Sequence, residues 1–144
     1  MRLKAYYINT ELDEPRRLGM EATCSELDLD CSRVVLPRLG DAVVRRCVEE
    51  TKLRAFECSL AHAHRGILRR VRAAGAPALV LEDDARLNPL VPAGRAQEML
   101  REAAAGSGFV MAGWRHGADG WDPVMGRLTG IYGQYAQYTQ YGTV

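Results

Sequence analysis

The sequence lacks the features that mark membrane, secreted and nucleic-acid-binding proteins. It contains no apolar run close to the roughly 20 residues that a membrane helix needs. Its start, MRLKAYYIN, has neither the apolar segment nor the small-residue cleavage site of a signal peptide. The formal net charge is only +1, which gives no excess of positive charge for nucleic acid or an anionic membrane. We therefore expect a cytoplasmic protein with no transmembrane segment and no nucleic-acid partner.

The sequence also lacks any CxxC pair, although it contains 4 cysteines, at positions 24, 31, 47 and 58. Without that spacing there is no support for a zinc ribbon or a thioredoxin-like site. Without a secretory signal, reduced thiols are the default state. We expect packed or incidental thiols.

The length of 144 residues fits one domain with its own hydrophobic core. The apolar periodicity and the turn residues predict an alternation of strands and helices along most of the chain. The order is β-α-β-α-α-β-α-β, with strands at 3–9, 31–37, 78–82 and 109–114 and helices at 16–30, 41–50, 52–74 and 92–108. This order predicts an α/β sandwich of Rossmann type with a mainly parallel central sheet.

The clearest helix, 52–74, shows one apolar face and is followed at once by an apolar strand. Residues spaced by three and four share that face: Phe56, Leu60, Ala63, Ile67, Val71 and Ala74. Gly75 and Pro77 end the helix. The continuous apolar run that follows, 78–82, is typical of a central parallel strand covered on both faces.

Three consecutive carboxylates, Glu82, Asp83 and Asp84, come at the end of that strand. Ligands of open parallel sheets bind at the carboxyl ends of the strands, and neighbouring carboxylates need a counter-charge. Mg²⁺ or Mn²⁺ is one candidate. In an extended segment Glu82 and Asp84 point one way and Asp83 the other, so one side could hold a metal diphosphate while Asp83 meets a sugar or an arginine. Taken alone, the triplet is equally compatible with an acidic surface turn.

Two histidines lie on the helix 52–74. His62 falls away from the apolar stripe, whereas His64 lies nearer the stripe and is expected to be structural. Ser59 lies on the flank between the stripe and His62. A shared zinc site is disfavoured because the i, i+2 spacing points the two rings apart.

Two blocks, AYYINTELDEPRR and ECSLAHAHRGILRRVRAAGAPALVLEDDARLNP, resemble glycosyltransferase family 25, the lipopolysaccharide-biosynthesis and collagen-galactosyltransferase-like group. Ile8 and Asn9 match the family's Ile-Asn-Leu opening, with Thr10 in place of Leu. The second block matches its Cys-x-Leu-Ser-His segment and its Leu-Glu-Asp-Asp strand end; the matching residues are Cys58, Leu60, His62 and 81–84, with Ala61 where Ser is usual. The resemblance covers about residues 3–114.

The resemblance implies a GT-A fold, a nucleotide-sugar donor and a bound metal, Mn²⁺ or Mg²⁺. On this reading Glu82 and Asp84 hold the metal, and Asp84 thereby takes a catalytic part. The nucleotide-sugar-binding residues would be Asn9, Arg17, Ser59, His62 and Asp83. Arg16 is the alternative to Arg17 as the family's arginine.

The end of the chain departs from the family pattern. Family members are usually longer, and their acceptor-side residues follow the strand that matches 109–114. We therefore expect a single domain, 1–144, whose core is 1–114 and whose residues 115–144 form a loop or an incomplete acceptor-side segment, as in a fragment or a reduced homologue. Asp122, or otherwise Asp119, is the candidate general base. Trp114 and Trp121 would either stack on a sugar or pack.

The leading functional prediction is metal-assisted transfer of a hexose from a UDP-sugar to a glycan or protein acceptor. The first alternative is a non-catalytic nucleotide-sugar or metal-binding remnant of such a domain. A metal-dependent phosphoesterase is a third reading, but it needs further His or Asp ligands on other strand ends, and the sequence offers few.

Overall fold

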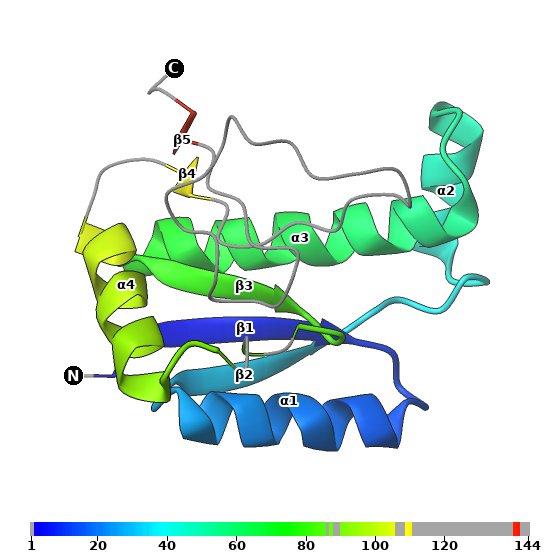
Figure 1. Ribbon diagram of the computed structural model, residues 1–144. Helices are drawn as coiled ribbons and strands as arrows, with labels where there is room; N and C mark the ends of the chain where they lie inside the picture. The colour runs from blue at the N-terminus through cyan, green and yellow to red at the C-terminus, as the bar shows by residue number, and fades with distance from the viewer. Residues whose placement is uncertain (1, 86, 88–89, 106–108, 111–139, 142–144) are drawn as a thin grey trace, which may run out of the picture. The chain divides into compact units, whose positions relative to one another are not determined.

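The computed structural model describes residues 2–85, 87, 90–105, 109–110 and 140–141. Two compact units make up the chain, residues 1–22 with 29–84 and residues 23–28 with 85–144. The predicted core, 1–114, therefore includes parts of both units. The elements follow the predicted order (Figure 1): β1 Lys4–Asn9, α1 Glu14–Glu26, β2 Asp30–Val35, α2 Ala42–Glu50, α3 Ala55–Ala74, β3 Ala78–Glu82, α4 Ala93–Ala105, β4 Phe109–Val110 and β5 Gln140–Tyr141.

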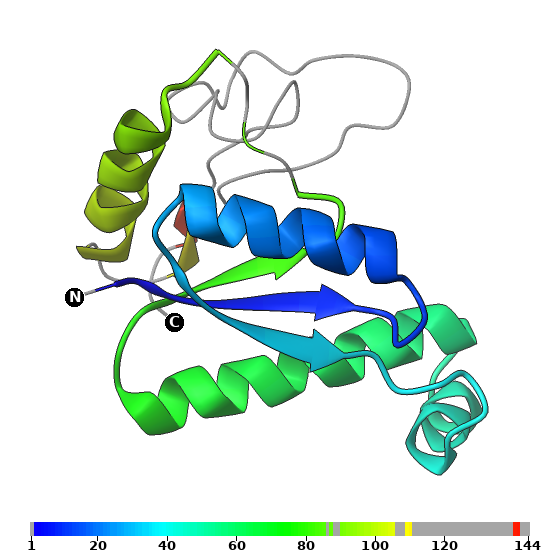
Figure 2. The same ribbon diagram turned by 90° about the horizontal axis from the view of Figure 1, so that it is seen from below.

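The first unit contains a three-stranded parallel sheet in the order β2-β1-β3. Figure 2 shows the three arrows side by side and pointing the same way, with β1 in the middle. The predicted α/β architecture with a parallel sheet is therefore confirmed. The prediction that 78–82 is the central strand is wrong, because within the described part of the chain β3 pairs with β1 alone. An apolar run indicates that helices cover both faces of a strand. It does not show whether the strand lies at the centre of the sheet or beside the central strand.

Helices α1 and α3 cover opposite faces of this sheet (Figure 1). Successive side chains of β1 alternate between the two faces. Tyr6 and Ile8 form a core cluster with Ala63 and Ile67 of α3. Tyr7 faces the other way, and its hydroxyl donates to Glu21 of α1 at 3.4 Å. The sheet therefore lies between two helical layers.

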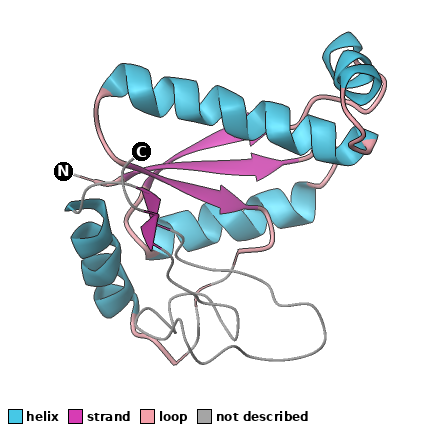
Figure 3. Cartoon of the chain, turned by 90° about the horizontal axis from the view of Figure 1, so that it is seen from above, coloured by secondary structure: helices cyan, strands magenta, loops and turns pink. Residues whose placement is uncertain are grey.

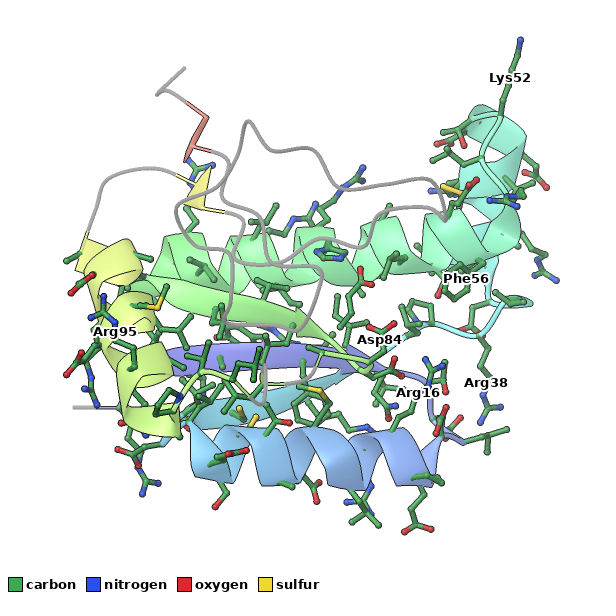
Figure 4. All side chains as sticks on the ribbon, in the orientation of Figure 1. Arg16, Arg38, Lys52, Phe56, Asp84 and Arg95 are labelled. Atoms are coloured by element: carbon green, nitrogen blue, oxygen red, sulfur yellow. A yellow bond between two sulfur atoms is a disulfide. The ribbon has the colours of Figure 1, made fainter. Side chains whose placement is uncertain are left out.

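The predicted apolar face of α3 is confirmed in the middle of the helix and is wrong at both ends, since Ala74 in the last turn is exposed. Ala63 and Ile67 are buried, and Leu60 and Val71 pack partly buried against the core cluster. Phe56 is 54% exposed, because the first turn of α3 extends past the tips of the strands (Figure 4). Gly75 ends the helix in the left-handed conformation, at φ 61°.

A disulfide joins Cys47 of α2 to Cys58 of α3, with the two Cα atoms 5.8 Å apart. All 4 cysteines of the sequence lie among the described residues, and none is free. The expectation of reduced thiols is therefore wrong for this structure. The 11-residue separation carries no recognisable spacing, and the two sulfur atoms meet only because α2 folds back on the start of α3.

The second unit contains α4 and a short antiparallel pair. The Gln97 side chain of α4 donates to the carbonyl of Glu26 at 3.2 Å. Only the first two residues of the predicted strand 109–114 form β4 among those described, and β5 pairs with them. The segment predicted as a loop thus contributes one short strand. Its remaining residues lie outside the described part of the chain, together with the sites predicted at Asp119, Asp122, Trp114 and Trp121.

None of the helices that the structure describes is long and apolar enough to span a membrane. The longest is α3, with 20 residues. It carries several arginines, including Arg65, Arg69 and Arg70.

Candidate functional site

The carboxyl ends of β1 and β3 form a topological switch point. From β1 the chain crosses to β2 on one side of the sheet, and it then returns to β3 on the other side. The connecting helices α1 and α3 lie on opposite faces, so the two connections diverge at this point (Figures 1 and 2). Open parallel α/β sheets bind their ligands just outside such a point. The residues that follow β1 and β3 are therefore the first place to look for a site.

Asn9, the last residue of β1, links the two strand ends across the switch point. Its side-chain nitrogen donates to a carboxylate oxygen of Asp83 at 2.9 Å and to the carbonyl of Asp13 at 3.3 Å. The residue is fully buried. Its side-chain oxygen is also buried and accepts no hydrogen bond from the part of the chain that is described. One amide therefore fixes the end of β3 and the loop after β1 against each other.

Arg16, in the first turn of α1, supplies positive charge to the same cluster. Its guanidinium lies 3.0 Å from the second carboxylate oxygen of Asp83. The hydrogen bond and the charge of Asp83 raise the pKa of Arg16, and the charges of Asp13 and Asp84 act in the same direction. Asp83 is only 14% exposed. Arg16 thus provides the counter-charge that was predicted for the acidic triplet at Asp83, and the Asn9 amide adds a neutral hydrogen bond.

Arg17, the arginine predicted to bind the nucleotide, does not approach the acidic triplet. Its guanidinium pairs with Glu14 at 3.0 Å and with Glu21 at 2.8 Å, both on α1. Consecutive residues of a helix point about 100° apart, so only one of the two arginines can face the strand ends. The structure assigns that position to Arg16.

Glu82 lies on the other side of the strand from Asp83, as the alternation predicts. It pairs in register with Ile8, on the face covered by α3, and it lies 3.7 Å from the ring of His64. Asp84 is exposed and lies near Arg16 at the tip of the sheet (Figure 4). The site therefore has Glu82 beside His64 on the α3 side, and Asp83 and Asp84 beside Arg16 on the α1 side.

The described residues include no group of three His, Cys, Asp or Glu side chains placed to hold a metal ion. The described residues therefore do not form a metal site made of protein ligands alone. Mg²⁺ and Mn²⁺, however, are often held by one or two carboxylates together with substrate phosphates and water. Glu82 and Asp84 carry the oxygen ligands that such a cation takes, and a bound diphosphate and water would have to complete its coordination.

Two other predicted donor-binding residues have different surroundings. Ser59 is 1% exposed, and its hydroxyl donates to the carbonyl of Pro37 at 2.7 Å, so it holds the loop after β2 against α3. His62 is exposed, on the side of α3 away from the core, as predicted. His64, which was predicted to be structural, is the histidine that approaches Glu82. The contact between His64 and Glu82 depends on how α3 packs against β3, which cannot be read from the sequence.

Sequence reasoning also missed the ties between the loops around the site. Arg38, after β2, makes two bonds to one carboxylate oxygen of Glu11, after β1, at 3.0 and 2.6 Å. Arg33 of β2 donates to the carbonyl of Thr10 at 2.8 Å. These contacts fix the loop that leads from β1 into Asp13. The available signal was the basic side chains of Arg33 in β2 and Arg38 after it, but a basic residue does not by itself identify its partner.

No protein-family model matches this sequence, and no curated protein matches it.

Proposed function

We propose that the chain transfers a hexose from a nucleoside-diphosphate sugar, with UDP as the nucleotide, to a glycan or protein acceptor, in the manner of glycosyltransferase family 25. One observation carries the proposal. Asn9 and Asp83 belong to the two separate motifs of the resemblance, and their side chains are hydrogen-bonded across the switch point. If the acidic triplet were only a surface turn with no bound ligand, there would be no reason for the two motifs to meet at this point.

The charges around this point suit a diphosphate leaving group. When the bond between the sugar and the phosphate breaks, negative charge develops on the diphosphate. The guanidinium of Arg16 lies beside the strand ends and can share that charge. A divalent cation held by Glu82 and Asp84 would supply Lewis-acid stabilisation of the same charge. Asn9 acts as a positioning residue, because its amide holds the ends of β1 and β3 together.

The fold agrees with the proposal at a coarse level. A three-stranded parallel sheet with helices on both faces is a Rossmann-like α/β arrangement. The finer assignment to the GT-A fold is part of the proposal. It rests on the resemblance together with the position of the acidic triplet after β3.

Calorimetric titration of UDP, with and without Mn²⁺, tests the proposal. We expect Mn²⁺-dependent binding to the wild type and its loss in Asp84→Asn. Asp30→Asn is the matched control, because Asp30 is an exposed aspartate that pairs with Lys4 at the opposite end of the sheet. Equal binding by all three proteins would show that the acidic triplet does not hold the nucleotide-bound cation.

A second candidate is a binding module that takes a nucleotide sugar and transfers nothing. Its favouring observation is that Arg16 and Asn9 already occupy Asp83, while the described residues offer no three-ligand metal set. Turnover separates the two candidates. Release of UDP from UDP-glucose or UDP-galactose with Mn²⁺, above the rate of Asp84→Asn, supports transfer. Binding of UDP without release supports the module.

A further inference from the structure

Helix α2 has little hydrophobic attachment to the rest of the first unit. Among its 9 residues only Val44 is buried, while Val43 and Val48 remain 41% and 39% exposed. Isolated helices of this length are marginal in water, so most of their stability must come from tertiary attachment. The covalent bond from Cys47 to Cys58 is therefore a principal tether of α2 to α3.

The disulfide belongs to a compact cluster at the end of α2. The Thr51 hydroxyl donates to the carbonyl of Cys47 at 2.7 Å and accepts from the backbone of Leu53 at 3.1 Å. The same oxygen lies 3.9 Å from the sulfur of Cys47 and 3.8 Å from that of Cys58. The last turn of α2, the disulfide and the turn into α3 thus form one unit.

This cluster connects to the loops beside the candidate site. Ser59, next to Cys58, holds the carbonyl of Pro37, and the neighbouring Arg38 binds Glu11 in the loop after β1. Figures 1 and 3 show α2 at the end of the sheet toward which the strands point. The position of α2 is therefore coupled, through α3, to the loops that follow β1 and β2.

We propose that the Cys47–Cys58 pair is a redox-operated clamp, which holds α2 on α3 when oxidised and releases α2 when reduced. Cys47 is partly exposed on the outer helix, whereas Cys58 is 1% exposed. A reductant therefore reaches the sulfur of Cys47 first. The sheet and α3 keep their own core, built around Ile8, Ala63 and Ile67, in either state.

The exchange is a two-electron step with a dithiol as the reductant. One thiolate of the dithiol attacks the sulfur of Cys47, the bond to Cys58 breaks, and Cys58 leaves as a thiolate that takes up a proton. The second thiol of the dithiol then displaces Cys47, which is released as a thiol. The protein has gained two electrons and two protons, and the dithiol has become a cyclic disulfide. Oxidised glutathione reverses the process by the same exchange.

The clamp does not depend on the proposed glycosyl transfer. Disulfides persist in oxidising compartments, and those found in the cytosol are usually transient and redox-sensing. In either place the bond reports the redox state to the loops around the strand ends. Whether those loops bind UDP is a separate question with a separate test.

Hydrogen exchange measured by mass spectrometry tests the clamp. The proteins compared are the oxidised wild type, the wild type treated with dithiothreitol, and Cys47→Ser, which breaks only this bond. We expect exchange over residues 42–51 to rise by about tenfold or more in the last two, with exchange in β1 unchanged. Val48→Ser is the matched control, because it places a serine on the exposed face of the same helix and keeps the disulfide.

Several outcomes would overturn the clamp. Wild-type protection of α2 in Cys47→Ser would show that packing alone holds the helix. An equal rise in β1 and α2 in Cys47→Ser would show that this bond stabilises the whole unit and does not act on α2 alone. Failure of oxidised glutathione to restore the protection of α2 in the reduced wild type would show that the bond is not reversible.

Discussion

At the scale of single residues, two adjacent arginines have opposite surroundings. Arg16 lies against Asp83, and Arg17 pairs with two glutamates of its own helix. We predict that Arg16→Gln weakens Mn²⁺-dependent UDP binding by about tenfold or more, because a charge-assisted contact is lost. Arg17→Gln should leave the affinity unchanged. Calorimetry of the two variants side by side checks this, and equal losses would contradict the assignment to Arg16.

Among the residues of the candidate site, we expect substitution of Asn9 to lower the free energy of unfolding most directly. Asn9→Ala removes the amide from the partly buried carboxylate of Asp83 and from the carbonyl of Asp13. We expect the free energy of unfolding to fall by about 1–3 kcal/mol, the usual cost of leaving such a group without its partner. Urea unfolding measures it, and Thr10→Ala, at the exposed next position, is the control. Equal unfolding free energies would show that Asn9 does not support the strand ends.

The sequence places some of these residues and not others. Asn9 and the acidic triplet follow from strand ends, which apolar runs locate well. The choice between Arg16 and Arg17, and that between His62 and His64, depends on the rotation of a helix about its axis. A shift of one residue in the helix changes the direction of a side chain by about 100°, so residue patterns alone do not decide it.

At the scale of secondary-structure elements, α3 packs on the sheet through a buried apolar cluster. Ile67 is 0% exposed in the core cluster, while its neighbour Leu68 is 55% exposed. Ile67→Ala should lower the free energy of unfolding by about 2–5 kcal/mol through lost burial and a cavity. Leu68→Ala should change it by less than about 0.5 kcal/mol. Urea unfolding of the two variants distinguishes this packing from the reverse orientation of α3, which would exchange the two effects.

Packing of α1 on the other face leads to a pH-dependent prediction. Burial raises the pKa of Tyr7 above its ordinary 10.0, and the charge and hydrogen bond of Glu21 raise it further. The folded state therefore favours the protonated phenol, whose stabilising contribution is complete below the ordinary pKa and is lost as pH rises through the raised one. We expect Tyr7→Phe to lose less stability than the wild type between about pH 9 and pH 11. Urea unfolding across that range checks this, and parallel curves would contradict it.

The order of the elements was predictable because apolar periodicity and glycine signals define them locally. The return of α2 onto α3 was not predictable in the same way. Its apolar positions, Val43, Val44 and Val48, mark a face but do not show what that face contacts. The position of β3 beside β1 was not predictable either, because the residues of a strand do not specify which strand it pairs with.

At the scale of the whole molecule, the candidate site belongs to the first unit alone. Asn9, Arg16 and residues 82–84 all lie in residues 1–22 and 29–84. The fold class could be predicted from the sequence, since the alternation of strands and helices implies a parallel sheet. The division of the chain after Asp84 could not be predicted, because the Pro89, Pro92 and Gly94 that follow it are typical of any loop and do not mark the boundary of a compact unit.

The central claim is that the switch point between β1 and β3 binds a nucleoside diphosphate with its cation. The most direct measurement is a titration of ¹⁵N-labelled protein with UDP and Mg²⁺, followed by the chemical shifts of the backbone amides. We expect saturable shifts at Asn9, at Arg16 and over residues 82–84, with none at Lys4 or Asp30 at the other end of the sheet. Shifts confined to that other end, or the absence of any shift at saturating UDP, would contradict it.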